Sequence, residues 1–97
     1  MDAKVMAAVP ARVLDISSRG VLIELARVLQ PLRRCDLRIQ FPEGEFAVCA
    51  VVRRCRAWGY GVDDDSQRVM LYRAGLEFEE VAPEYLARLS ASVLFQT

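Results

Sequence analysis

Residues 15–20 read Asp-Ile-Ser-Ser-Arg-Gly, a D-x-S-x-x-G pattern, and they decide how the rest of the chain is interpreted. Ala11 to Leu14 precede this pattern and Val21 to Leu25 follow it, and both flanks are rich in residues that favour strands. Asp, Ser and Gly are common where two such strands are joined by a short turn. The stretch therefore predicts a β-hairpin whose corner is residues 15–20.

The corner carries side chains that can order its own backbone. The oxygens of Asp15 and Ser17 can accept hydrogen bonds from nearby amides, and Gly20 can take the positive φ that a tight reversal often requires. Such a corner can present a compact face to an anion. The same residue types also occur in hairpin corners that bind nothing, so both interpretations stay open for these six residues alone.

Length and charge limit the classes of function. The 97 residues are 54% hydrophobic, which predicts one domain, residues 1–97, around a single modest core. Lys and Arg together number 13, as do Asp and Glu, so the formal net charge is zero. Broad binding to nucleic acid needs an excess of cations, and this balance argues against it.

Cysteine usage and hydropathy indicate the compartment. The chain has three cysteines, Cys35, Cys49 and Cys55, but no C-x-x-C pair and no histidine. We interpret the cysteines as reduced thiols, and no zinc-ligand spacing is present. No apolar run reaches the ~20 residues that a membrane-spanning helix needs, and residues 1–6 lack the plan of a secretory signal. We expect a cytoplasmic chain without a membrane span, a metal or a cofactor.

Periodicity predicts the fold class. Extended segments are predicted over residues 5–16, 21–28, 36–41, 46–52 and 69–81, and a polar loop over 59–67. The side chains that this alternation turns toward the core are Val21, Ile23, Leu25, Leu37, Ile39 and Phe41. Pro83, Glu84 and apolar residues at helical spacing predict a helix over 83–95. The fold class is therefore mainly β, a small antiparallel β-barrel of about six short strands with a C-terminal α-helix.

Three segments, in order, resemble the PilZ domain family. Residues 11–21 resemble its D/N-x-S-x-x-G segment, whereas residues 51–53 and 72–78 resemble its later strands. PilZ domains are bacterial receptor modules for the second messenger cyclic di-GMP. The resemblance implies a six-stranded barrel and no catalysis. The residues agree, because the chain has no histidine and no arrangement that suggests an activated nucleophile or an acid–base pair.

The resemblance also implies a site for cyclic di-GMP. Asp15, Ser17 and Gly20 occupy the first ligand motif of the family, and Arg19 within it is a candidate for a further phosphate or guanine contact. The second family motif is R-x-x-x-R, on a segment before the first strand. Residues 1–9 contain only one cation, Lys4, and residues 1–10 match the family poorly. Residues 34–38 do spell R-x-x-x-R, but they follow the first motif, so we interpret them as a coincidence.

Two functions follow from the missing motif. In the first, the chain is a divergent PilZ module that acts through contacts with a protein partner, a parent-protein domain or a second copy of itself. The loss of arginine contacts worth about 1.5–3 kcal/mol for each charged hydrogen bond can take a micromolar ligand out of range. In the second, the chain is a cyclic di-GMP receptor whose arginine arm comes from elsewhere.

A third interpretation belongs to another class, a small barrel that binds single-stranded nucleic acid. It rests on cations that lie beside aromatic residues, namely Arg53, Arg54, Arg56, Trp58 and Tyr60. We prefer the alternative, in which this segment is a solvated strand end whose Trp58 covers the edge of the core.

Overall fold

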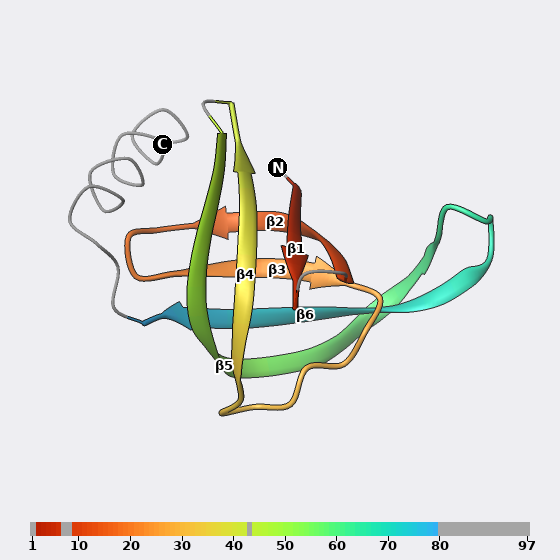
Figure 1. Cartoon of the computed structure of the whole chain (residues 1–97). Helices are drawn as coiled ribbons and strands as arrows, with labels where there is room; N and C mark the ends of the chain where they lie inside the picture. The colour runs from red at the N-terminus through yellow and green to blue at the C-terminus, as the bar shows by residue number, and fades with distance from the viewer. Residues whose placement is uncertain (1, 7–8, 43, 80–97) are drawn as a thin grey trace.

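The computed structural model describes residues 2–6, 9–42 and 44–79, all of which lie in strands or in the turns and loops between them (Figure 1). The strands are β1 (Asp2–Val5), β2 (Val9–Ile16), β3 (Gly20–Leu25), β4 (Arg34–Phe41), β5 (Gly44–Val62) and β6 (Arg68–Phe78). The predicted mainly β fold of six antiparallel strands is confirmed. The helix predicted over residues 83–95 lies outside the described residues.

The strands pair in the order β1-β2-β3-β6-β5-β4, and β1 also pairs with β4, which closes the barrel. β1 makes this closure with only four residues, since Ala3 lies opposite Ala11 of β2 on one side and Ile39 of β4 on the other. The predicted segment 5–16 therefore contains β2 and only the last residue of β1, which begins before the predicted segment. The chain reverses after Val5, where Met6 has a φ of 52° and its amide donates to the Asp36 carbonyl at 2.8 Å.

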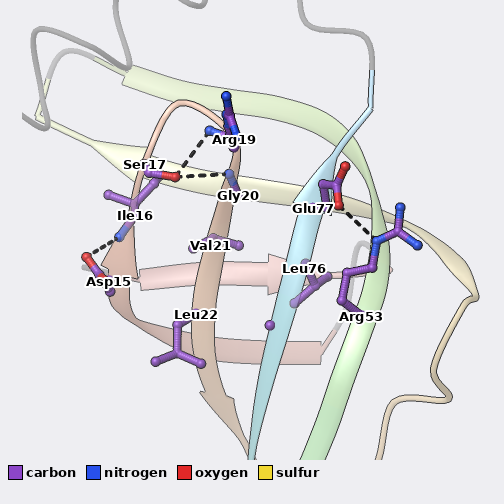
Figure 2. A pocket seen from close by; sticks show the side chains of 11 residues that line it. Asp15, Ile16, Ser17, Arg19, Gly20, Val21, Leu22, Arg53, Leu76 and Glu77 are labelled. Carbon is purple, nitrogen blue, oxygen red and sulfur yellow. Dashed lines mark hydrogen bonds and ion pairs between the residues drawn. The ribbon is translucent and has the colours of Figure 1, made fainter.

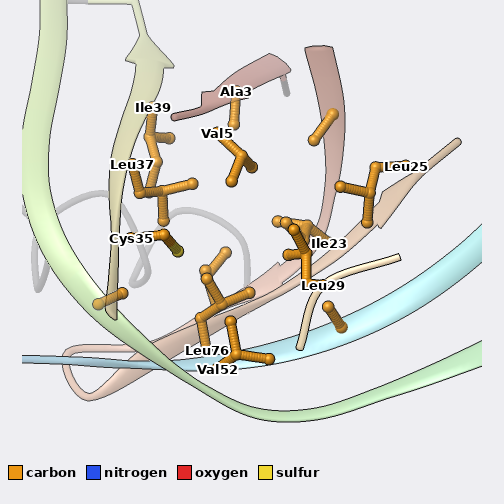
Figure 3. Close-up of a cluster of buried hydrophobic side chains, with 14 of the residues drawn as sticks. Ala3, Val5, Ile23, Leu25, Leu29, Cys35, Leu37, Ile39, Val52 and Leu76 are labelled. Carbon is orange, nitrogen blue, oxygen red and sulfur yellow. The ribbon is translucent and has the colours of Figure 1, made fainter. Parts of the chain in front are cut away.

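Alternating apolar residues fill the barrel (Figure 3). In β4, Leu37 and Ile39 are fully buried while Asp36, Arg38 and Gln40 face the solvent. Phe46 packs edge-to-face on Phe78, with 6.1 Å between the ring centroids. The predicted inward face of β3, with Val21, Ile23 and Leu25, is confirmed, and so are Leu37 and Ile39, whereas Phe41 is only half-buried.

β5 is longer than the sequence predicts and leaves the barrel. It pairs with β4 only as far as Val51 and continues along β6 to Val62. The pairing of β3 with β6 ends at Tyr72, so residues 59–62 and 68–71 form a two-stranded ribbon that projects from the barrel, at the right of Figure 1.

The loop predicted over residues 59–67 is therefore wrong in its first half, and only residues 63–67 are a loop. Two glycines favour a loop in this segment, but Gly61 lies in the ribbon. A glycine suits this position, because a Cβ at position 61 would come within 2.6 Å of the Leu71 side chain. Asp63 ends the ribbon with its carboxylate, which accepts hydrogen bonds from the amides of Asp65 at 2.9 Å and Gln67 at 2.8 Å.

The connection from β3 to β4, residues 26–33, lies along the base of the ribbon. Leu29 is buried and its amide donates to the Cys55 sulfur at 3.4 Å. Leu32 donates to the Val52 carbonyl at 2.6 Å, and the Val52 amide donates to Arg33 at 2.9 Å. These bonds hold the connection against β5. β3 ends at Leu25, short of the predicted residue 28. In the described ranges, we find no helix with the length and apolarity needed to cross a membrane.

Candidate functional site

The D-x-S-x-x-G corner joins β2 to β3 and is held by its own polar side chains (Figure 2). Asp15 Oδ1 accepts a hydrogen bond from the Ile16 amide at 2.9 Å. Ser17 Oγ accepts from the amides of Arg19 at 3.2 Å and Gly20 at 3.3 Å, while the Ser17 amide donates to the Gly20 carbonyl at 2.9 Å. The hydrogen bonds predicted for Asp15 and Ser17 are therefore present, and both side chains stabilise the corner.

Gly20 is needed for a reason that the sequence does not show. Among the described glycines only Gly44 has a positive φ, so the expectation that Gly20 adopts one is wrong. Gly20 lies opposite Glu77 of β6, and a Cβ built on it would collide with the carbonyl oxygen of Leu76. The Arg19 carbonyl accepts a hydrogen bond from the Phe78 amide at 2.8 Å, which fixes the corner against the end of β6.

Two β-bulges shape the surface beside the corner. The register between β2 and β3 shifts between Val13 and Asp15, and that between β5 and β6 shifts between Val52 and Arg54. A bulge adds one residue to one strand and redirects the side chains that follow. In β5 the extra residue is Arg53, so two successive residues face outward after the buried Val52. The second bulge thereby brings a cation to the surface beside β6.

An open pocket of about 430 Å³ lies between the corner, β5 and β6. It contains all four residues proposed from the sequence and adds Arg53 and Glu77; its charged and polar lining consists of Asp15, Ser17, Arg19, Arg53 and Glu77. Ile16, Val21 and Leu76 contribute apolar surface. The structure thus brings the predicted residues together and places two guanidinium groups with them. We call this space the corner pocket.

The two arginines of the corner pocket have different partners. Arg19 is exposed and forms no ion pair within the part of the chain that the structure describes. Arg53 Nε donates to Glu77 Oε2 at 2.9 Å, and about half of each side chain is exposed. Figure 2 shows Arg19 at the corner and Arg53 on the other side of β6, with Glu77 between them. One cation is therefore free and the other is held by an exposed carboxylate.

The R-x-x-x-R stretch at residues 34–38 has another role. Arg34 donates to both carboxylate oxygens of Glu79, from Nε at 2.7 Å and from Nη2 at 2.5 Å. These hydrogen bonds hold the pKa of the Glu79 carboxyl below its ordinary value. Arg38 donates to Glu45 at 3.1 Å. Neither arginine lines the corner pocket, in agreement with their interpretation as a coincidence.

Trp58 lies elsewhere than predicted. It is 61% exposed, and the Arg73 guanidinium lies over its ring at 3.8 Å from the centroid. The expectation that Trp58 covers the edge of the core is wrong, because the bulge between Ala57 and Gly59 turns it to the outer face of the ribbon. The three cysteines are free, and within residues 2–6, 9–42 and 44–79 no cluster of side chains could hold a metal ion.

Comparison with known protein families gives one assignment. The sequence model of the PilZ domain matches residues 3–95, nearly the whole chain. This chain belongs to the PilZ domain family. A search of curated proteins found no match. Among solved structures, the PilZ domain with c-di-GMP of YcgR from Escherichia coli is similar, with a TM-score of 0.65 and 20% sequence identity. The similarity covers 84% of this chain and 66% of that one, and it supports the fold.

Sequence reasoning missed Arg53 and Glu77 as neighbours of this PilZ motif. In the sequence, Arg53 belongs to a basic stretch and Glu77 to a predicted strand, and neither pattern predicts a site residue. A signal was present, because two successive arginines after an apolar run break the alternation of a regular strand and are compatible with a bulge. The pairing of Arg53 with Glu77 depends on the register of β5 and β6, which no local pattern specifies.

Proposed function

We propose that this PilZ domain is a non-catalytic bacterial signalling module that receives cyclic di-GMP at the corner pocket. The observation that carries the proposal is the gathering of Asp15, Ser17, Arg19 and Gly20 with Arg53 in one open pocket. Three free cysteines are consistent with a reducing compartment, and we place the module in the cytoplasm.

The chemistry of the corner pocket fits a guanine nucleotide. A guanidinium group presents several N–H donors in one plane, which suits both phosphate oxygens and the O6 and N7 acceptors of guanine. Arg19 is available for such a contact without breaking an ion pair of the described residues. Arg53 has to exchange Glu77 for the ligand, and an exposed pair of this kind contributes only about 0–1 kcal/mol. The exchange of Glu77 for the ligand therefore costs Arg53 little free energy.

The expected affinity is low for a receptor of this family. Each charged hydrogen bond is worth about 1.5–3 kcal/mol, and every ~1.4 kcal/mol changes affinity tenfold. Residues 1–9 supply no arginine, so Arg19 and Arg53 replace only part of what an R-x-x-x-R arm would contribute. An arginine pair supplied by another chain would tighten the complex.

Calorimetric titration of the full chain with cyclic di-GMP tests the proposal. Substitution of Asp15 or Ser17 would also loosen the corner, so the informative variant is Arg19→Gln with Arg53→Gln. The matched control is Arg12→Gln with Arg38→Gln, which removes the same charge from two arginines in exposed ion pairs outside the pocket. We expect heat from the parent and the control and at least a tenfold weaker affinity in the pocket variant. Equal affinity in all three proteins contradicts the proposal.

A second function is supported by a separate observation. Tyr60 and Val62 are each more than 60% exposed on one face of the ribbon outside the barrel. Exposed apolar side chains gathered in one place mark protein interaction sites. If the parent chain gives no heat with cyclic di-GMP, the PilZ domain acts through protein contacts alone, and this ribbon is the surface that it would use.

A further inference from the structure

The large apolar side chains that face solvent are not scattered over the molecule. Seven are at least 36% exposed in the described part of the chain, and six of them belong to the ribbon or to the segments at its base: Met6, Val28, Leu32, Trp58, Tyr60 and Val62. The seventh, Leu22, lines the corner pocket. A concentration of this kind indicates a surface that a partner covers.

One face of the ribbon continues the inner face of the barrel. Tyr60 lies opposite Met70 and Val62 opposite Arg68, and alternation along β6 puts Met70 and Arg68 on the same side as the buried Ala74. Beyond the barrel this face loses its cover, since Tyr60 is 63% and Val62 69% exposed. A two-stranded ribbon alone is marginally stable in water. Arg68 also lies on this face, and its guanidinium lies over the Tyr60 ring at 4.2 Å from the centroid. The inner face therefore combines exposed apolar side chains with a stacked cation and lacks a covering layer.

A second hollow lies at the base of the ribbon, and we call it the base pocket. It has a volume of about 440 Å³ and shares no lining residue with the corner pocket. Val28, Leu29 and Val52 give it an apolar lining, and Arg27 and Arg33 stand at it as exposed cations. Neither arginine forms an ion pair within the described residues. The base pocket thus combines apolar surface with unpaired positive charge.

The tip of the ribbon has the complementary composition. Val62 is followed by three successive aspartates, residues 63–65. Asp63 uses its carboxylate to close the turn, whereas the carboxylates of Asp64 and Asp65 have no partner among the described residues. An apolar side chain followed by free acids matches an apolar hollow flanked by free arginines. The acids lie at the tip of the ribbon, whereas the base pocket lies on the barrel side and is lined by none of the ribbon residues 59–62 and 68–71.

We infer that the ribbon docks a second copy of this chain, with the tip of each copy in the base pocket of the other. The exchange is reciprocal, so a two-fold axis relates the copies and the assembly closes as a dimer. Each ribbon would cover the Tyr60 and Val62 face of its partner. The zero net charge of the chain does not oppose the association. The bulge at Trp58 interrupts the free edge of β5, which disfavours open-ended strand addition.

The charge pattern favours a second copy over single-stranded nucleic acid. A phosphate backbone that followed the ribbon past Trp58 and Tyr60 would meet the aspartates of the tip and be repelled. A second copy places those aspartates against Arg27 and Arg33. Salt-dependent binding of an oligonucleotide, weakened by Trp58→Ala and unaffected by the oligomeric state, would favour nucleic acid and overturn the dimer.

Charge exchange tests the docking directly. Sedimentation velocity over a dilution series compares the parent chain with three variants. One reverses the charge of the tip (Asp64→Lys with Asp65→Lys), and one reverses the charge of the base pocket (Arg27→Glu with Arg33→Glu). The third carries all four substitutions. The control, Asp2→Lys with Glu45→Lys, changes the charge by the same amount at positions that line neither pocket. Val62→Ser tests the apolar part, and since Val62 is 69% exposed this variant keeps the fold.

We expect a concentration-dependent dimer for the parent and the control. Each pair of charge reversals weakens it at least about tenfold, because like charges then face each other across the interface. The chain with all four substitutions recovers the dimer, and Val62→Ser weakens it. A parent that remains monomeric at every concentration, or a dimer that all four substitutions fail to restore, overturns the inference. The result is independent of the corner pocket, whose titration with cyclic di-GMP is a separate measurement.

Discussion

Gly20 at the start of β3 packs so closely on the carbonyl oxygen of Leu76 in β6 that a Cβ at position 20 would collide with that oxygen. The two strands pair from Gly20–Glu77 to Leu25–Tyr72, so this contact stands at the end of the ladder where the corner meets the pocket. The glycine of D-x-S-x-x-G is therefore a packing requirement between two strands that are distant in the sequence.

Gly20→Ala tests this contact. The added methyl group has to push β3 away from the Leu76 carbonyl, and we expect a loss of about 1–3 kcal/mol in the free energy of unfolding. Urea unfolding followed by circular dichroism measures it. Gly59→Ala is the control, because nothing lies within 4 Å of a Cβ there, and its effect should stay within about 0.5 kcal/mol. Equal effects at the two glycines would contradict the packing argument.

The parts of the fold that the sequence predicts are those that local alternation encodes. Val21, Ile23 and Leu25 alternate with polar or exposed neighbours, and their burial follows from period two alone. The hydrogen bonds of Asp15 and Ser17 are likewise local, since they join residues no more than three apart. The motif and its immediate geometry could therefore be predicted.

The parts that the sequence does not predict depend on register between distant strands. Gly20 meets Leu76 only when β3 has paired with β6. Arg53 meets Glu77 only when β5 and β6 have paired and a bulge has shifted one against the other. The glycines and aspartates of residues 59–65 are turn-forming residue types and therefore predict a loop. The strands of the ribbon form because β6 supplies a hydrogen-bonding partner for each residue from Gly59 to Val62. The sequence of residues 59–62 does not itself indicate that partner.

Glu77→Gln should strengthen binding of cyclic di-GMP at the corner pocket. The substitution frees Arg53 from its ion pair and removes a negative charge that faces the phosphates of the ligand. An exposed ion pair is worth about 0.2–1 kcal/mol, so the dissociation constant should fall by roughly one and a half- to fivefold. Calorimetric titration measures it, with Glu45→Gln as the control, since Glu45 holds Arg38 in a similar exposed pair outside the pocket. Weaker binding by Glu77→Gln would show instead that this carboxylate contacts the ligand.

Trp58 is the single tryptophan of the chain and reports on its own exposure. Because it is 61% exposed, its emission maximum in the folded chain should lie close to that of the unfolded chain, and acrylamide should quench both to a similar extent. Arg73→Gln removes the cation over the ring and should change the emission intensity. The cation–π contact is worth about 0.5–1 kcal/mol, and the loss of stability should exceed it because Arg73 Nε also donates to Glu24 at 3.2 Å. A large red shift on unfolding would show that Trp58 is covered in solution, as the sequence predicted.

Cys35 should make the stability of the barrel depend on alkaline pH. Its side chain is only 8% exposed, and burial raises the pKa of the thiol above its ordinary value of 9.0, with Cys49 and Asp36 acting in the same direction. The folded chain therefore holds this proton more tightly than the unfolded chain. The stabilisation is complete below pH 9.0 and is lost as the pH rises from there through the pKa of the folded state.

The measurement compares urea midpoints of the parent and Cys35→Ala from neutral pH to alkaline pH. All other side chains are common to the two proteins, so the difference between them isolates the thiol. The advantage of the parent should be constant below pH 9.0 and then shrink, by at most about 1.4 kcal/mol for each pH unit. Cys55→Ala, at a half-buried position, is the control for the pH dependence and not for the size of the loss, since it also removes the acceptor of the Leu29 amide. If the difference between the parent and Cys35→Ala does not change with pH, the Cys35 thiol ionises as readily in the barrel as in the unfolded chain.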